Sequence, residues 1–195
     1  MPQNMHAKNT PKLIFRRSWL YDLALKRGKD FKMPHANVLD AHVRKLEKSW
    51  KKHGQGILKA ITQTTKLNWH EREIVCYITA GVIPYSDPLT LNRWSDIHTI
   101  THELIHRILS EPENWKKVQK NWSRIMKRYK HESDKTKGHV VVHAIHGIIL
   151  EKYFGGTALE KEKKAIRDPN YVRSWNIAGR DGYQYIVGEL ARGIK

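Results

Sequence analysis

The segment from His102 to His106 constrains the fold and the chemistry of this chain more than any other segment does. It reads His-Glu-Leu-Ile-His, with two histidines four residues apart in a stretch of helical periodicity. Residues four apart lie on one face of a helix, so both imidazoles can reach a single metal ion. Glu103 follows the first histidine directly, where its carboxylate can take a proton from a water held at that metal. The segment therefore predicts a metal-binding helix with a general base.

Signals for a helix flank this motif on both sides. Ser95 and Asp96 are favourable N-cap residues, and Pro112 follows the motif where a helix should end. Apolar residues recur between these limits at steps of three and four, which gives one face to bury and another to carry histidines. They are Ile97, Ile100, Leu104, Ile105 and Ile108.

A catalytic zinc ion takes three protein ligands and keeps one position open for water, so a third ligand must come from elsewhere in the chain. A second helical segment, residues 138–154, offers His139, His143, His146 and Glu151. The three histidines share one face, whereas Glu151 lies about 80° around the helix from His143. We therefore expect the central His143 to be the ligand, with His139 and Glu151 as alternatives.

The remaining polar groups of this segment suit supporting roles. We expect His146 to donate a hydrogen bond to the oxyanion that forms during catalysis, with Tyr171, Tyr183 or Tyr185 as rivals. Zn²⁺ is the expected ion, because imidazole is a suitable ligand for this borderline-soft cation.

Basic residues far outnumber acidic ones, 36 Lys and Arg against 19 Asp and Glu, for a net charge of +17. Residues 1–60 alone hold 14 basic and 4 acidic residues. A field of this sign favours nucleic acid, acidic proteins or an anionic surface as a partner, and a solubilising charge explains it equally well.

The chain has a single cysteine, Cys76, so it can form no intramolecular disulfide. It contains no apolar run of signal-peptide or membrane-span length. We therefore expect a cytoplasmic protein with no membrane partner.

The other elements follow from periodicity. We expect a disordered segment at 1–12, one domain over 13–195, and a helix from 37 to about 67 that breaks at Gly54–Gly56. Residues 73–81 predict a strand, either a core strand or one whose edge pairs with an extended substrate. Further helices are expected at 114–129, where an aromatic stripe with Trp115 and Trp122 should enter the core, and at about 182–191.

The motif at His102, Glu103 and His106 resembles that of the zincin metallopeptidases. The order of long helix, strand, metal helix and later ligand-bearing helix is similar to the compact gluzincins, in which the later helix supplies a glutamate, so this resemblance implies Glu151 as third ligand. The SprT-like proteases, which act on DNA-bound proteins, are also similar and imply a later histidine, His139 or His143, with DNA binding. The fold so implied is α+β and zincin-like, mostly helical, with a small sheet above the metal helix.

These patterns together predict a zinc metallopeptidase that acts on a protein or peptide substrate, with Glu103 as general base. The alternative is a basic nucleic-acid-binding protein, or a DNA-associated SprT-like protease, with a structural or vestigial zinc site.

Overall fold

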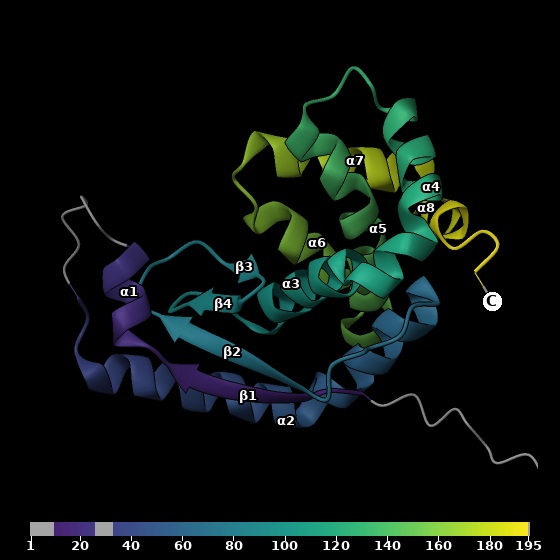
Figure 1. Cartoon of the computed structure of the whole chain (residues 1–195). Coiled ribbons are helices and arrows are strands. Elements are labelled where there is room, and N and C mark those ends of the chain that lie inside the picture. The colour runs from purple at the N-terminus through teal and green to yellow at the C-terminus, as the bar shows by residue number, and fades with distance from the viewer. Residues whose placement is uncertain (1–9, 26–32, 195) are drawn as a thin grey trace, which may run out of the picture. The chain divides into compact units, whose positions relative to one another are not determined.

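The computed structural model describes residues 10–25 and 33–194 of the 195-residue chain. This part is mostly helical and contains one small mixed sheet, which confirms the predicted α+β class (Figure 1). The residues group into two compact units, each described here by itself. One comprises 10–25, 33–59 and 68–103, and the other comprises 60–67 and 104–194. The single domain expected over 13–195 stays a prediction.

A four-stranded sheet organises the first unit. Its strands follow the order β1-β2-β4-β3; the pairs β1–β2 and β2–β4 are parallel, and β3 pairs antiparallel with β4. β2 therefore lies between β1 and β4, which confirms the core-strand alternative. β4 pairs with Tyr77–Thr79, so this part of β2 offers no edge to a substrate. The strands are β1 (Lys12–Arg17), β2 (Glu73–Thr79), β3 (Tyr85–Ser86) and β4 (Leu89–Asn92).

The start of the chain differs in part from the expected disorder. Residues 1–9 lie outside the described residues, whereas Thr10 donates a hydrogen bond to Gln55 at 2.7 Å. Lys12 begins β1, because its main chain pairs with β2 opposite Glu73. A short helix, α1 (Trp19–Leu25), follows β1, and its buried Asp22 accepts the backbone N–H of Ala80 at the end of β2 at 2.7 Å.

The long helix α2 (Ala36–Thr65) is continuous, so the predicted break at Gly54–Gly56 is wrong. Gly54 is buried, and a Cβ atom at this position would overlap the indole ring of Trp50 one turn earlier. The glycine therefore makes room for a buried tryptophan instead of ending the helix. Trp50 in turn lies close to β1, since it lines a cavity together with Leu13 and Phe15.

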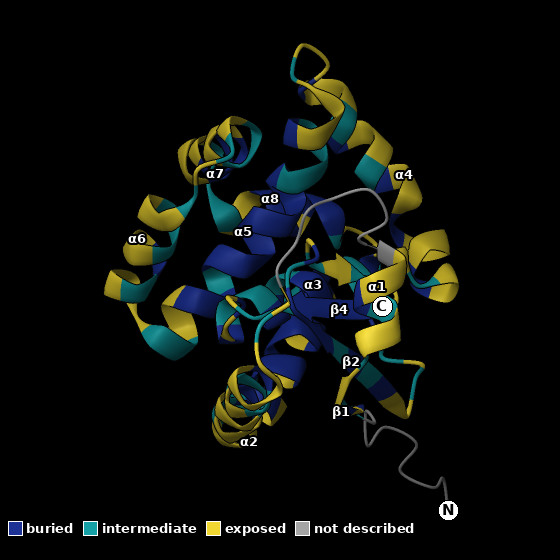
Figure 2. Ribbon diagram, turned by 90° about the vertical axis from the view of Figure 1, so that its left-hand side faces the viewer, coloured by how far each residue is buried: buried dark blue, intermediate teal, exposed yellow. Residues whose placement is uncertain are grey.

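Helix α5 (Asp134–Phe154) is central to the second unit, where it packs against α6 (Gly156–Ala165), α7 (Pro169–Asp181) and α8 (Tyr183–Leu190). Apolar residues occupy every side of α5 between Val140 and Leu150, a pattern typical of a fully buried helix. Eleven of its 21 residues are buried. Much of its ribbon is accordingly dark blue in Figure 2. The sequence predicted α5 and α8 but missed α6 and α7.

Helix α4 (Pro112–Arg128) lies where the sequence predicts it, but its buried face is rotated relative to the predicted aromatic stripe. The buried residues are Asn114, Val118, Asn121 and Ile125. Asn121 is buried because its side-chain amide donates to the carbonyls of Leu190 at 3.0 Å and Arg192 at 2.8 Å. Trp115 remains 37% exposed and Trp122 half-buried, so the prediction that this aromatic stripe enters the core is wrong for Trp115.

Within the described residues, no helix combines the length and the apolar character needed to cross a membrane. Cys76 lies buried in β2. A cytoplasmic location stays a prediction.

The packing at Gly54 predicts a stability change. Gly54→Ala should lower the free energy of unfolding by about 1–3 kcal/mol, because the new methyl group must displace a buried indole. Gly188→Ala is the matched control, since Gly188 lies in α8 with open space around its Cβ position, and helix propensity alone should stabilise it by up to about 1 kcal/mol. Urea denaturation followed by circular dichroism measures both. A Gly54→Ala variant as stable as the Gly188→Ala variant would contradict this packing.

Candidate metal centre

Helix α3 (Ile97–Ser110) carries the motif and begins as predicted. The carboxylate of Asp96 accepts the backbone N–H groups of His98 at 2.9 Å and Thr99 at 3.1 Å, which caps the first turn. The helix ends before Pro112, where Glu111 caps the start of α4 by accepting the N–H of Asn114. The motif therefore lies on a helix with defined ends.

His102 and His106 extend from neighbouring turns of α3. The boundary between the two units falls inside this helix, between Glu103 and Leu104, and the helix is continuous there. The position of His102 relative to His106 therefore follows from α3 itself. Both side chains are half-buried.

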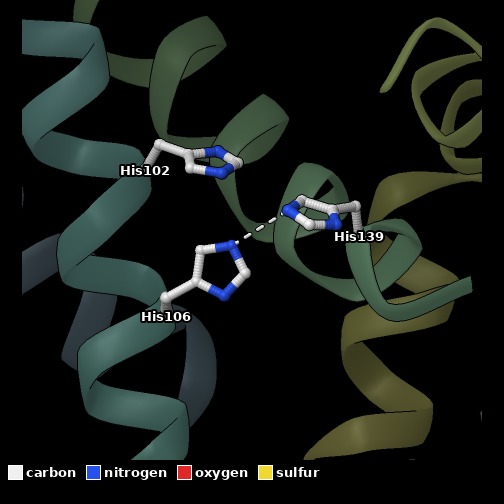
Figure 3. A group of neighbouring side chains, drawn as sticks. All are labelled: His102, His106 and His139. Carbon is white, nitrogen blue, oxygen red and sulfur yellow. Dashed lines mark hydrogen bonds between the residues drawn. The ribbon is translucent and has the colours of Figure 1, made fainter. Parts of the chain in front are cut away.

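A third imidazole approaches them from another helix. His139 lies near the start of α5, and its Nε2 is 3.2 Å from the Nε2 of His106 (Figure 3). One ring nitrogen from each of His102, His106 and His139 lies within 4.8 Å of the other two. We call these three residues the histidine group.

Hydrogen bonding fixes how His139 faces the group. Its Nδ1 lies 2.8 Å from the carbonyl oxygen of Lys135, which can only accept, so Nδ1 carries the proton. In the neutral ring Nε2 is then unprotonated, which is the form in which this nitrogen can bind a metal ion. A carbonyl behind the distal nitrogen is the usual arrangement for a metal-ligating histidine.

The protonation states also suit a metal site. Burial and the nearby His139 lower the pKa of His106 to about 4, and burial lowers the pKa of His139. Both rings are therefore neutral at pH 7, which is the form that binds metal.

The group fits Zn²⁺ in its three imidazole donors and in the spacing of one pair of them, His106 and His139. Zinc–nitrogen bonds of about 2.0–2.1 Å in a tetrahedron place two ligand nitrogens about 3.3 Å apart. The separation between His106 and His139 is 3.2 Å. Three imidazoles form one of the ligand sets of catalytic zinc, and the fourth position then remains for water.

The other candidates from α5 are not members of the histidine group, although the ring of His143 lies near that of His139, with centroids 5.6 Å apart. The ring of His143, expected as the third ligand, stacks on Trp175 with centroids 4.4 Å apart, and its Nδ1 lies 2.7 Å from Ser174 Oγ. His146 is also buried beside Trp175. Glu151 is exposed, about 18 Å further along α5 than His139. None of the three belongs to the histidine group among the described residues. The spacing thus supports His139, the alternative left open by the sequence.

The three tyrosines that the sequence offers as oxyanion donors differ in position. The ring of Tyr171 packs against His139 with centroids 4.4 Å apart. Tyr183 packs instead against Trp175, and the hydroxyl of Tyr185 accepts a hydrogen bond from Arg128 at 3.2 Å. Of these tyrosines, Tyr171 is the one that contacts the histidine group.

Glu103 is 9% exposed, and burial raises its pKa to about 7. A carboxylate with a pKa near neutrality can both accept and return a proton at pH 7, as a general base and acid must.

Two supporting contacts were not predicted from the sequence. The Lys135 carbonyl is a backbone group, and Ser174 lies 31 residues from the histidine that it contacts. Only the spacing of Lys135 and His139, one helical turn, hints at the first contact.

Comparisons of the chain with protein-family models, with curated proteins and with solved structures each find no match. No relative therefore supplies an activity for this chain.

The histidine group predicts which substitution removes zinc binding. His139→Ala should lower the zinc affinity by more than about 100-fold, the upper cost of losing a group that only supports a ligand. His143→Asn should retain affinity within about 10-fold, since Asn keeps a polar partner for Ser174. Competition with a chromophoric chelator measures both affinities. A larger loss of zinc affinity in His143→Asn than in His139→Ala would establish His143 as the ligand.

Proposed function

We propose that this chain is a zinc-dependent metallopeptidase, with His102, His106 and His139 as metal ligands and Glu103 as general base. The approach of His139 Nε2 to within 3.2 Å of His106 Nε2 carries the proposal. It brings a third imidazole from a separate helix to a motif that by itself supplies two.

Zn²⁺ bound by the histidine group would polarise the carbonyl of a peptide bond and acidify a water. The Glu103 carboxylate accepts a proton from that water as the water oxygen bonds to the carbonyl carbon. Glu103 then returns the proton to the amide nitrogen as the carbon–nitrogen bond breaks. One water is consumed, and a carboxylic acid and an amine are released.

The carbonyl oxygen gains negative charge as the water oxygen bonds to the carbon. This oxyanion needs a hydrogen-bond donor besides the metal. His146 was expected in this role, but it lies among buried residues beside Trp175. Contact with His139 favours Tyr171, whose hydroxyl can donate.

Substitution of the base tests the proposal. Glu103→Gln should lower peptide hydrolysis by at least about 100-fold, because an amide cannot accept the proton, while about one zinc per chain is retained. Glu73→Gln is the control, since Glu73 is an exposed carboxylate on β2 and should leave turnover unchanged. Cleavage of a quenched fluorescent peptide library and elemental mass spectrometry give the two readouts. Equal turnover in Glu103→Gln and wild type would exclude Glu103 as the base.

A second candidate function is nucleic-acid binding, and the surface of α2 favours it. Between residues 44 and 52 this helix exposes five basic side chains against the single acidic Glu47. They are Arg44, Lys45, Lys48, Lys51 and Lys52. Such a basic stripe suits contact with successive phosphates, and it is compatible with a protease recruited to nucleic acid.

Salt dependence tests this second function. Labelled duplex DNA should bind with an affinity that falls steeply between about 50 and 200 mM salt, and Lys48→Glu combined with Lys52→Glu should reduce the logarithmic slope by about 2. Fluorescence anisotropy measures the binding, and Lys161→Glu on α6 is the control. Absence of binding to DNA and RNA at low salt would exclude this function.

A further inference from the structure

A cavity of about 370 Å³ lies next to the histidine group, within the second unit. Its lining comprises His106, Leu109 and Ser110 from α3 and Trp115 and Trp122 from α4. His106 therefore belongs both to the histidine group and to the wall of this cavity. The volume is near the lower end of the range of about 300–1,000 Å³ for small-ligand sites, which suits one large side chain.

Two tryptophans make the lining of the cavity apolar and aromatic. The rings of Trp115 and Trp122 meet edge to face, with centroids 5.7 Å apart, and Trp115 is 37% exposed. Exposed indole surface beside an apolar cavity gains free energy when an apolar group covers it. Leu109 adds an aliphatic wall. The lining thus favours an aromatic or long aliphatic side chain.

The surroundings of the cavity are basic. Helix α4 holds six Lys and Arg residues against one acidic residue, Glu113. Lys116 pairs with Glu113 at 2.6 Å and Arg128 with Glu189 at 3.4 Å. Lys117, Lys120 and Lys127 are exposed on the same helix. This charge attracts acidic groups on whatever enters the cavity.

We propose that this cavity is a specificity subsite that takes a large apolar side chain of an acidic peptide. The inference rests on the proposed peptidase function and adds its substrate class. A cavity wall shared with His106 places the apolar side chain close to the bond that would be cleaved. The lysines of α4 bind the acidic residues on either side of it.

Peptide binding to the full-length Glu103→Gln variant, loaded with zinc, tests the subsite without turnover. The probes are fluorescein-labelled peptides with one phenylalanine between pairs of aspartates, its counterpart with alanine for phenylalanine, and its counterpart with lysines for aspartates. By fluorescence anisotropy the phenylalanine peptide should bind about 10- to 100-fold more tightly than the alanine peptide. The lysine peptide should bind at least about 10-fold more weakly than the aspartate peptide.

Tryptophan variants test whether this cavity causes the preference for the phenylalanine peptide. Trp115→Ala should abolish the difference between phenylalanine and alanine peptides, whereas Trp115→Phe should largely keep it. Trp94→Ala is the matched control, because Trp94 is 64% exposed and lies outside the cavity lining. Circular dichroism checks the fold of each variant.

Equal affinity for the phenylalanine and alanine peptides would overturn the proposal, as would an unchanged preference in Trp115→Ala. Displacement of the peptide by a single-stranded oligonucleotide but not by an unlabelled acidic peptide would assign the cavity to nucleic acid and also overturn it. If the phenylalanine peptide binds more tightly but the wild-type protein hydrolyses no peptide, the cavity binds such peptides and the peptidase function is excluded. If the wild-type protein hydrolyses peptides but the phenylalanine and alanine peptides bind equally, the peptidase function is supported and the subsite is overturned.

Discussion

Burial of α5 determines where the chemistry of the second unit can lie. Apolar residues on all sides of the helix between Val140 and Leu150 require neighbours all around it, and α6, α7 and α8 provide them. Histidines in this middle section are therefore enclosed and serve in packing, as His143 does against Trp175. Only the first turns of α5 leave a half-buried histidine, and His139 lies there, opposite His106.

The motif helix was fully predictable because all its determinants are local. The Asp96 cap, the apolar repeat and the stop before Pro112 lie within 17 residues of one another, and α3 has the expected limits. The strand at 73–79 was equally readable from its β-branched residues. Its place in the middle of the sheet was not, since strand order depends on pairing with segments far along the chain.

Helical periodicity placed three histidines on one face of α5, but it did not predict which of them lies near α3. Residues 139, 143 and 146 share one side of a helix, and periodicity contains no information on which turn of that side faces another helix. A similar limit explains α4, where Trp115 and Val118 both fit an apolar stripe. Asn114 donates to the carbonyl of Ile108 in the preceding helix and Asn121 to that of Leu190, and these hydrogen bonds rotate the buried face away from Trp115. Polar residues with such partners look like surface residues in the sequence alone.

X-ray absorption at the zinc edge of the purified protein tests most directly whether three imidazoles hold a zinc ion. We expect about one zinc per chain, with nitrogen and oxygen neighbours at about 2.0–2.1 Å and outer-shell scattering from three imidazole rings. The scattering should fall to two rings in any His139→Ala protein that retains zinc. Zinc absent even after its addition, or a wild-type spectrum with sulfur neighbours or with two imidazoles, would contradict a zinc site of three histidines.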